Sequence, residues 1–356
     1  MKKVLLISNK VMHYRVSIYN YLNSQFHKEG WELIVRSNAL QKENPHPVNF
    51  DFKEVAFHFS AYKEEIERIN PDAVILFVHL RDLMVWPLVH WLKIKKIPVV
   101  FWMKAKNYDN PDSLTSSLLY HYMHTICDGL ILYSKHEMPH IHKRHRSKTF
   151  VASNTLNFSD YPDISETREG IKLELGIPFK KVVLSVGRMG ADGGRKKIDH
   201  LIEIFKKPRV DGVGLVIVGS GVSPELLETM NKATTVYLGE VYDSTNVTIS
   251  KIFKMADVFC IPGHVGLGLN QAFYWGLPVV TEEGGQPPEI HYLISGRNGF
   301  LVPNNDVEEL ERKIMYLLTD EAARKAFSEN AREDILREAS MEQMFKGFKQ
   351  CLDSLG

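Results

Sequence analysis

The segment from Cys260 to Glu289 contains the residues best suited to bind an anion. Its sequence predicts a strand, a glycine-bearing loop, a short helix and a second strand, with Gly266 and Leu267 where the helix begins. The first N–H groups of a helix have no partner within the helix, and the helix dipole favours negative charge at that end. A loop that opens directly onto a helix N-terminus is therefore a suitable phosphate site, and the pattern indicates phosphate-linked chemistry.

Basic residues earlier in the chain could serve the same anion. Arg188 follows a predicted strand, and the run Arg195, Lys196 and Lys197 precedes a predicted helix. Arg188 and Lys196 could hold a diphosphate through charge-assisted hydrogen bonds. The run could instead be a solvated basic turn, and the sequence leaves both interpretations open.

Glycine and polar residues follow other predicted strands of this half. Gly219 and Gly221 would let a ring or a ribose approach the backbone, or would form an ordinary turn. His264 either faces the donor pocket or lies in solvent. Glu282 and Glu283 could supply a carboxylate to that pocket, or could be a polar strand end.

Polar residues also follow the predicted strands of the amino-terminal half. His13, Tyr14 and Arg15 come after the first strand. Arg15 could bind a phosphate or an acceptor carboxylate, or could only begin the next helix. His79 and Lys104 each follow a later strand, and each is either a catalytic candidate or a structural or solvated residue.

The segment 135–148 is the most basic part of the chain and holds four histidines. It could bind anionic lipid or a phosphorylated acceptor, because clustered Lys and Arg attract acidic headgroups. It could also be a solvated helix face. The histidine spacing matches no zinc motif.

These residues need a framework, and the hydrophobic pattern indicates one. Apolar runs typical of buried strands alternate with helical patterns, which predicts parallel sheets in α/β domains with ligands at the carboxyl ends of the strands. The predicted strands are 4–8, 32–36, 73–78, 98–102, 129–133, 149–152, 182–186, 214–218, 235–238, 258–261 and 278–281. The predicted helices include 15–29, 83–95, 198–205, 320–338 and 341–354.

The length of 356 residues predicts two domains, since one core seldom organises so long a chain. We expect Rossmann-like domains at 1–156 and 167–338, a linker at 157–166, and a C-terminal helix at 339–356 that could cross back to the first domain. Asp306, with Glu309 three residues later, predicts a helix N-terminus.

Composition narrows the class of protein. With 44% hydrophobic and 24% charged residues, the chain is typical of soluble globular proteins, and a net charge of +1 argues against a nucleic-acid partner. The three cysteines match no metal spacing and are typical of reduced thiols in a cytosolic protein. The first apolar run is too short for a signal peptide, and no segment is long enough to span a bilayer. We expect a cytoplasmic protein whose membrane contact, if any, is peripheral at the inner face.

The order of several short motifs resembles the donor domain of retaining GT-B glycosyltransferases of family 4. The resemblance covers about residues 180 to 330. The motifs are 186–188 with Lys196, 216–221, 237–239, 262–267, 276–280 and 299–303. The resemblance implies a GT-B fold, with two Rossmann-like domains facing each other across a cleft.

The resemblance also implies roles for individual residues. Arg188 and Lys196 would bind the diphosphate of a nucleotide sugar, and the N–H groups of Gly266 and Leu267 would hold the distal phosphate. The donor-binding residues it implies are Gly187, Gly219, Gly221, Tyr237, Leu238, His264, Val265, Gly266, Leu267 and Gln271. The catalytic candidates are Arg188, Lys196, His79 and Lys104, and the acceptor or cleft candidates are His13, Tyr14 and Arg15. No metal is implied, because the cations take its place.

Two positions depart from the family pattern. Two glutamates eight positions apart usually contact the sugar and the ribose, and Gly263 and Gln271 stand there instead. The amide of Gln271 can still hydrogen-bond a ribose diol, whereas Gly263 has no side chain to replace a carboxylate. Sugar recognition is therefore where this chain must differ.

The resemblance implies a retaining transferase that moves a sugar from a UDP- or GDP-linked donor to a hydroxyl of a saccharide or lipid-linked saccharide. It suggests a role in cell-surface polysaccharide or glycoconjugate synthesis, with the nucleotide sugar as co-substrate and no other cofactor. The missing glutamates leave a catalytically weakened nucleotide-sugar-binding subunit as one alternative. A GT-B epimerase or phosphorylase is another, and the oligomeric state is not predicted.

Overall fold

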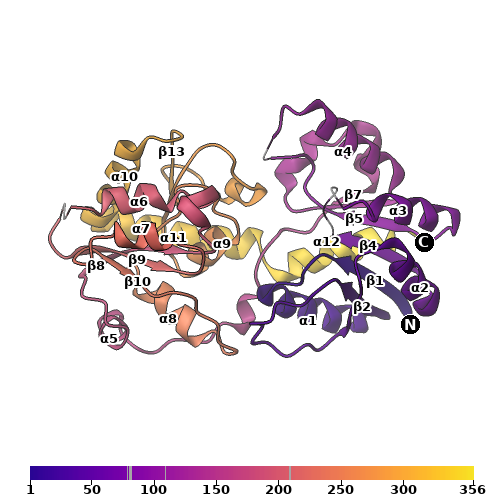
Figure 1. Cartoon of the computed structure of the whole chain (residues 1–356), viewed down its shortest axis with the longest axis horizontal. Coiled ribbons are helices and arrows are strands. Elements are labelled where there is room, and N and C mark those ends of the chain that lie inside the picture. The colour runs from indigo at the N-terminus through magenta and orange to yellow at the C-terminus, as the bar shows by residue number, and fades with distance from the viewer. Residues whose placement is uncertain (78, 80–81, 109, 208–209) are drawn as a thin grey trace. The chain divides into compact units, whose positions relative to one another are not determined.

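The computed structural model describes residues 1–77, 79, 82–108, 110–207 and 210–356, with the backbone alone at 191–193. The chain divides into two compact units (Figure 1). The first unit contains Met1–Asn157 together with Ala339–Gly356, and the second contains Phe158–Glu338. Residues 158–166, expected as part of a linker, thus group with the second unit.

The first unit is built on a seven-stranded parallel sheet with the order β3-β2-β1-β4-β5-β6-β7. The strands are β1 (Lys2–Ser8), β2 (Trp31–Ser37), β3 (Asp51–Glu54), β4 (Ala73–Phe77), β5 (Val99–Trp102), β6 (Gly129–Leu132) and β7 (Thr149–Val151). The parallel α/β arrangement is confirmed. β3 was not predicted, because this largely exposed edge strand lacks the apolar run of a buried strand.

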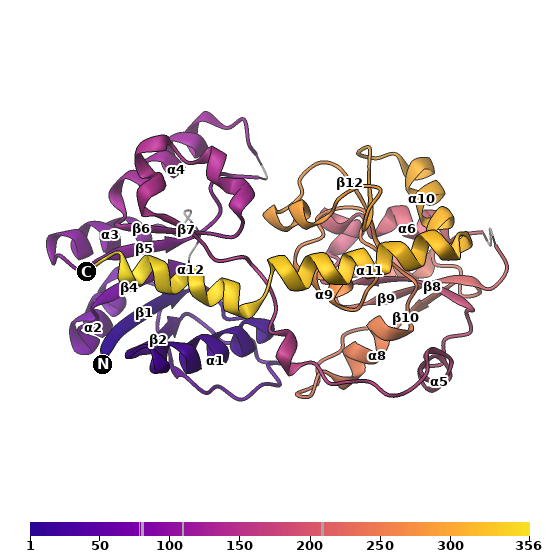
Figure 2. The same cartoon turned by 180° about the vertical axis from the view of Figure 1, so that it is seen from behind.

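Helices cover both faces of this sheet. The α-helices are α1 (His13–Lys28), α2 (Phe59–Ile69), α3 (Val85–Ile94), α4 (Leu114–Ile126) and α12 (Met341–Asp353), and the 3₁₀ helices are η1 (Lys135–His140) and η2 (Lys143–Lys148). One apolar core combines α1 and α12 with one face of the strands, and a second core combines α2, α3 and α4 with the other face. Figures 1 and 2 show α12, in yellow, beside α1.

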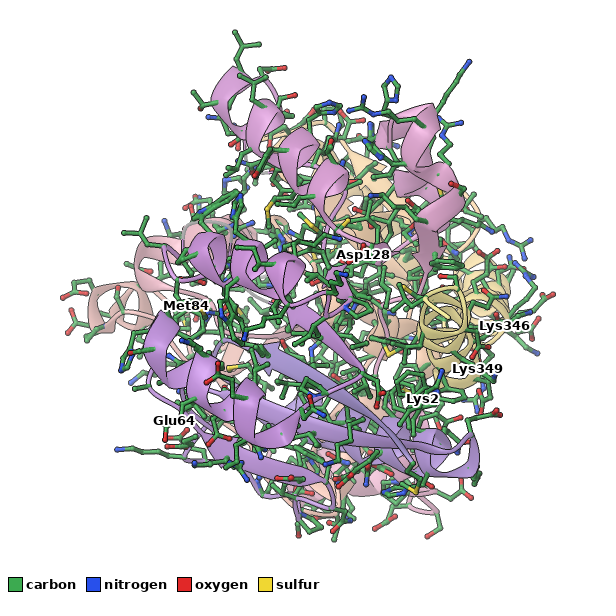
Figure 3. All side chains as sticks on the ribbon, turned by 90° about the vertical axis from the view of Figure 1, so that its right-hand side faces the viewer. Lys2, Glu64, Met84, Asp128, Lys346 and Lys349 are labelled. Carbon is green, nitrogen blue, oxygen red and sulfur yellow. The ribbon has the colours of Figure 1, made fainter. Side chains whose placement is uncertain are left out.

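The close approach of α12 to the sheet depends on two glycines. A Cβ atom on Gly347 would lie 2.1 Å from the carbonyl oxygen of Val151, and one on Gly129 would lie 2.5 Å from Sγ of Cys351. Lys346 and Lys349 lie on the other side of the helix, at the surface seen in Figure 3. The C-terminal helix is therefore an integral layer of the first unit.

The second unit has a six-stranded parallel sheet with the order β10-β9-β8-β11-β12-β13. Its strands are β8 (Lys181–Val186), β9 (Val213–Val218), β10 (Thr235–Tyr237), β11 (Val258–Cys260), β12 (Val279–Glu282) and β13 (Gly299–Val302). The α-helices are α5 (Arg168–Glu174), α6 (Ile198–Ile204), α7 (Pro224–Glu228), α8 (Val247–Met255), α9 (Leu267–Tyr274), α10 (Val307–Thr319) and α11 (Glu321–Glu338), and the 3₁₀ helices are η3 (Phe158–Asp160), η4 (Ala191–Lys196) and η5 (Pro288–Tyr292). The order reverses between β8 and β11, and at such a point ligands bind beyond the carboxyl ends of the strands.

Local sequence signals explain several boundaries. The side chain of Asp306 accepts a hydrogen bond from the N–H of Glu309 at 2.9 Å, so the predicted cap of α10 is confirmed. Cys127, Cys260 and Cys351 are buried free thiols. In the described part of the chain, no helix is both long and apolar enough to cross a membrane.

Candidate functional site

Glycines form the floor of the candidate site at the carboxyl ends of β8 and β9. The N–H of Gly219 donates to the carbonyl of Gly239 at 2.7 Å, and a Cβ atom on Gly219 would lie 1.9 Å from the carbonyl oxygen of Gly187. A Cβ on Gly221 would likewise lie 2.8 Å from the backbone nitrogen of Gly190. The three loops therefore approach so closely that only glycine fits at Gly219.

Lys196 reaches from the end of η4 to the loop before α9. Its Nζ donates to the carbonyl oxygens of His264 and, at 3.2 Å, Val265. A Cβ on Gly266 would lie 3.9 Å from the same Nζ. The ammonium group thus lies beside the loop that the sequence identified as an anion site.

The surroundings of Lys196 disfavour its charge when no anion is bound. Burial, together with repulsion from Arg195 and Arg188, lowers the pKa of Lys196 to about 8, although Glu289 acts in the opposite direction. Arg188 is exposed and pairs with no carboxylate among the described residues. An incoming anion would relieve this repulsion.

Gly263 pairs its backbone with the basic run. The N–H of Gly263 donates to the carbonyl of Lys196 at 2.9 Å, and the N–H of His264 donates to that of Arg195 at 2.8 Å. A Cβ on Gly263 would lie 2.1 Å from the carbonyl oxygen of Arg195. A side chain at position 263 would therefore clash with the backbone of Arg195 in this arrangement.

Gln286 and Thr281 fix the same loop, and the sequence did not identify them as site residues. The amide of Gln286 donates to the carbonyl of Gly263 at 2.8 Å and accepts from the N–H of Val265 at 3.1 Å. The hydroxyl of Thr281 donates to the carbonyl of Ile261 at 2.7 Å. Gln286 lies on a glycine-rich loop after β12, a position that could have pointed to such a role.

The N–H groups of Gly266 and Leu267 are available for an anion. Gly266 has a φ of +60° and precedes the first residue of α9. No hydrogen bond between described residues uses either N–H group, and the ring of His264 lies beside Gly266, 3.8 Å from where a Cβ would be. Together with the Nζ of Lys196, these amides form a compact group of donors at a helix N-terminus.

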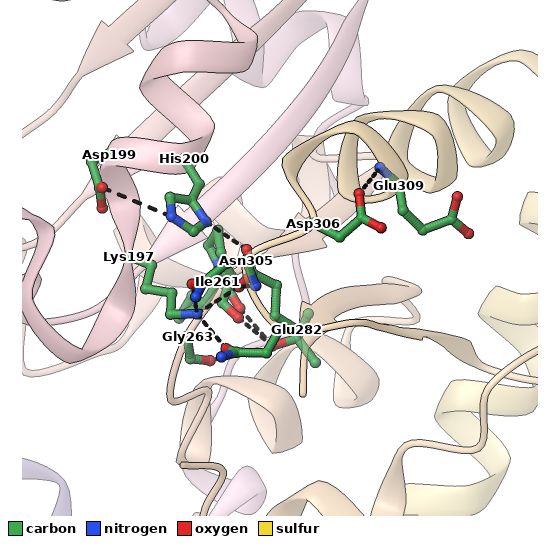
Figure 4. A network of polar contacts seen from close by, with 12 residues as sticks. Lys197, Asp199, His200, Ile261, Gly263, Glu282, Asn305, Asp306 and Glu309 are labelled. Carbon is green, nitrogen blue, oxygen red and sulfur yellow. Dashed lines mark hydrogen bonds and ion pairs between the residues drawn. The ribbon is translucent and has the colours of Figure 1, made fainter. Parts of the chain in front are cut away.

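Glu282 does not serve this site, since its carboxylate is already paired. It is fully buried, and it accepts from the Nζ of Lys197 at 2.6 Å, the Nδ1 of His200 at 2.5 Å and the backbone N–H of Asn305 at 2.8 Å (Figure 4). Burial alone would raise the pKa of Glu282, but these hydrogen bonds lower it. Lys197 is thus a structural cation, whereas Glu283 is exposed.

The residues expected near the base and ribose lie on the same edge. The hydroxyl of Tyr237 donates to the carbonyl of Gly219 at 2.7 Å, and Leu238 donates its N–H to the carbonyl of Ile217 at 2.9 Å. The amide of Gln271 donates to the hydroxyl of Tyr161 at 3.2 Å. The side chain of Gln271 is therefore held by the hydroxyl of a neighbouring tyrosine.

The amino-terminal candidates lie in the first unit, and Arg15 is buried there. Its guanidinium lies 4.8 Å from the ring centroid of Trp102 and donates to Oδ1 of Asn154 at 3.2 Å. Tyr14 packs at the edge of His13, with ring centroids 5.6 Å apart. Burial, with repulsion from His46, lowers the pKa of His13 to about 4. These contacts place the guanidinium of Arg15 against aromatic rings, and they leave open whether Arg15 also binds a ligand.

His79 and Lys104 follow β4 and β5. The N–H of His79 donates to Oδ1 of Asn9 at 2.9 Å, between the undescribed residues 78 and 80. Lys104 places its Nζ 5.9 Å from the ring centroid of Tyr108. Both follow strands whose carboxyl ends meet at one sheet edge, and nothing in the structure assigns either a chemical role.

The basic segment 135–148 forms η1 and η2, so its expected helical face is two short 3₁₀ turns. Glu137, buried within it, accepts from the N–H groups of Ala105 at 2.9 Å and Tyr133 at 3.0 Å. His145 is also buried. Part of this segment is structural and the remainder is exposed.

Comparison with known proteins agrees with this geometry. Residues 169–334 match the family described as Glycosyl transferases group 1. The match lies within the second unit, and we refer to residues 169–334 as the group 1 domain.

Individual relatives and solved structures are also similar to this chain. An uncharacterised glycosyltransferase of Methanocaldococcus jannaschii is 28% identical over 225 residues, which are 58% of this chain and 56% of that protein. Sulfoquinovosyl transferase SQD2 of Arabidopsis thaliana is 30% identical over 169 residues, which are 46% of this chain and 32% of that protein. The chain thus aligns with about half or less of these relatives. HepE of Anabaena, solved in complex with UDP, superposes with a TM-score of 0.77 at 15% identity over 99% of this chain and 100% of that one, so the fold is GT-B.

The group 1 domain presents a cation and backbone N–H groups in an arrangement that can bind an anion. Its donor groups lie in the loops and helices that follow β8, β9, β10 and β11. Among the described residues, no cluster of His, Cys, Asp or Glu has an arrangement that could hold a metal ion.

Proposed function

We propose that this chain is a glycosyltransferase whose group 1 domain binds a nucleoside diphosphate sugar, with UDP as the nucleotide. The observation that carries the proposal is the position of Lys196, half-buried beside the N–H groups of Gly266 and Leu267 and repelled by Arg188 and Arg195. A dianionic or trianionic ligand would relieve the repulsion among these cations most. The structures of HepE, solved with UDP and with UDP-glucose, make uridine the first nucleotide to test.

In this proposal the chain's own groups stabilise charge on the leaving diphosphate. As the bond to the sugar breaks, negative charge grows on the distal phosphate, where Lys196 and the two backbone amides are placed to donate. Arg188, exposed and without a carboxylate partner in the described residues, adds a mobile cation on the same edge. The N–H groups of Gly266 and Leu267 and the backbone of Lys196 need no rearrangement, because the Gly263 loop is paired with the backbone of Arg195 and Lys196.

The finer parts of the proposal are the stereochemistry and the acceptor. We expect retention of the anomeric configuration, with the leaving diphosphate assisting attack from its own face. The acceptor is the hydroxyl of a saccharide or a lipid-linked saccharide. The cations neutralise the diphosphate, so we expect transfer to continue in EDTA, and loss of transfer in EDTA with recovery on adding Mg²⁺ would contradict this.

A thermal-shift screen tests the donor assignment. UDP, GDP and CMP are each added to the full chain, and a nucleotide at a hundred times its Kd stabilises the fold by about 2.7 kcal/mol. We expect UDP to give the largest shift, and Arg188→Ala to reduce it. Lys232→Met is the matched control, because Lys232 is an exposed lysine of the same unit. If no nucleotide moves the melting curve of the wild type, the proposal is wrong.

Turnover distinguishes the remaining alternatives. Release of UDP together with a glycosylated acceptor supports transfer. UDP binding without any product would indicate the weakened binding subunit, which the filled space at Gly263 favours. An epimerised donor or a free sugar phosphate would indicate an epimerase or a phosphorylase.

A further inference from the structure

The side-chain amide of Gln286 connects the end of β12 to the loop that precedes α9. Its Nε2 donates to the carbonyl oxygens of Gly263 and Glu282, each at 2.8 Å, and lies 2.9 Å from Oγ1 of Thr281. Its Oε1 accepts from the N–H of Val265 at 3.1 Å. These contacts fix the orientation of the amide, because three oxygen atoms face its Nε2 and one N–H group faces its Oε1. Both ends of the amide therefore hold backbone groups.

The backbone on either side of Gln286 helps to place its side chain. Gly284 and Gly285 precede it with φ values of +86° and +61°, in the left-handed region that favours glycine. Pro287 follows it, and the residue before a proline is restricted to extended conformations. The glycines thus permit the turn after β12, and Pro287 limits the backbone conformations of Gln286.

Lys196 holds the same loop from the opposite side. Its Nζ donates to the carbonyl oxygens of His264 and Val265. In a trans peptide the carbonyl and the N–H point in opposite directions, so the N–H of Val265 points away from Lys196 and toward Gln286. A cation therefore holds the loop on one side, and a neutral amide holds it on the other.

A bound diphosphate would change the contacts of Lys196 but not those of Gln286. An ammonium group has three N–H donors, and the two loop carbonyls use two of those of Lys196. Lys196 can therefore give more than one hydrogen bond to a phosphate only by releasing a carbonyl. The amide of Gln286 is uncharged and bonds the other side of the loop, so its contacts persist when Lys196 turns to an anion.

We propose that Gln286 is a positioning residue for the distal phosphate of the donor. It holds the peptide group of Val265, so the N–H groups of Gly266 and Leu267 keep their place when Lys196 releases the loop. The chain should consequently prefer a nucleoside diphosphate to a nucleoside monophosphate, by a margin that depends on Gln286. The identity of the ligand rests on the proposed function, whereas the holding of the loop by Gln286 does not.

Titration calorimetry of the full chain with UDP and with UMP tests this proposal. UMP lacks the distal phosphate, so its affinity should not depend on the N–H groups of Gly266 and Leu267. We expect Gln286→Leu to raise the Kd for UDP by about tenfold, as for one lost hydrogen bond to a charged group, and the Kd for UMP by less than about twofold. Gln286→Asn keeps a polar amide on a shorter side chain, and it should also raise the Kd for UDP more than that for UMP.

Asn231→Leu is the matched control in the same unit. The amide of Asn231 is also half-buried, and it donates to the carbonyl of Lys206 at 2.9 Å and accepts from the N–H of Ala233 at 3.0 Å. Asn231 precedes β10, at the amino-terminal edge of the sheet. We expect this variant to leave the Kd for both nucleotides unchanged, even where its Tm falls as far as that of Gln286→Leu.

Inorganic pyrophosphate is titrated in parallel, because it carries two phosphate groups and no nucleoside. A wild type that binds pyrophosphate but not UDP contradicts the donor assignment, and the Kd of Gln286→Leu for pyrophosphate then tests the positioning role. Equal rises in the Kd for UDP and UMP would show that Gln286 only stabilises the unit, and would overturn the inference. An unchanged Kd for UDP, or for pyrophosphate where UDP does not bind, overturns it too, as does a wild type that binds neither.

Discussion

Lys196→Met should make the ligand-free protein more stable while abolishing its response to UDP. The pKa of Lys196 is lowered from 10.5 to about 8, and each pKa unit corresponds to 1.36 kcal/mol. Keeping this ammonium charged at pH 7 therefore costs about 3 kcal/mol relative to the unfolded chain. Methionine retains much of the aliphatic stem and removes the charge.

Two carbonyl groups limit the gain in stability of the Lys196→Met variant. Those of His264 and Val265 lose their donor in the variant, which costs about 1–2 kcal/mol. The expected net gain is about 1–2 kcal/mol, or a rise in Tm of about 2–8 °C for a unit of this size. The ligand-induced shift should disappear, since the diphosphate loses its buried cation.

The pH dependence gives the sign of the effect. Below pH 8, Lys196 is protonated in both the native and the unfolded state. The native state then bears the full free-energy cost of the buried charge. Between pH 8 and pH 10.5 the unfolded chain binds more protons than the native one, so the wild type gains stability as the pH rises. The advantage of Lys196→Met should therefore shrink across this window.

Thermal unfolding of wild type, Lys196→Met and the control Lys232→Met, each with and without UDP, measures these effects. The control should match the wild type in both conditions. A Lys196→Met protein that melts below the wild type at pH 7, or that still responds fully to UDP, would refute the reasoning.

Three further outcomes follow from the same contacts. The Kd for UDP should rise as the pH rises above 8, because Lys196 loses its proton, and the rise should approach tenfold per pH unit. Titration calorimetry from pH 7 to 9.5 measures this Kd. Gly263→Ala should lower the free energy of unfolding by about 1–3 kcal/mol, because its Cβ would lie 2.1 Å from the carbonyl oxygen of Arg195. Glu282→Gln should cost about 3 kcal/mol at pH 7, because it removes the buried carboxylate that pairs with Lys197 and accepts from His200 and Asn305. Because the pKa of Glu282 lies below 4.5, this stabilisation should be present above pH 4.5 and be lost as the pH falls through the lowered value.

Matched variants serve as controls for the Gly263→Ala and Glu282→Gln predictions. Gly170→Ala introduces a Cβ that meets only Oγ1 of Thr167, at 3.2 Å, and should melt like the wild type. Glu283→Gln removes an exposed carboxylate beside Glu282 and should change stability little. Equal effects in variant and control, measured by denaturant unfolding, would contradict either prediction.

The fold was largely predictable because its signals are local. Apolar runs separated by helical patterns indicated parallel sheets, and the observed strands overlap every predicted strand. The cap formed by Asp306 and Glu309 lies within one helical turn, so it could equally be predicted from the sequence. β3 and β13 were not predicted: β3 is an exposed edge strand without an apolar run, and β13 is a four-residue edge strand of the second sheet.

The site was predictable only in part. Arg188, Lys196 and the Gly266 loop could be identified as phosphate-binding candidates, because a strand end or a helix start is visible in the sequence. The separate roles of Lys196 and Lys197 were not visible, since their partners lie 68 and 85 residues away along the chain. Arg15 stays a candidate, and the sequence could not show that its guanidinium lies 4.8 Å from the ring centroid of Trp102, because the two residues are far apart along the chain.

The sequence by itself determined the α/β architecture and the presence of a glycine-bearing loop at a helix N-terminus, since both depend on neighbouring residues. Tertiary structure alone decided that a side chain at position 263 would meet the backbone of Arg195, and that the carboxylate of Glu282 is paired with Lys197 and His200. These outcomes depend on which distant backbones approach within a few ångströms. Spacing along the chain does not encode that distance, because it is set by how strands and loops pack.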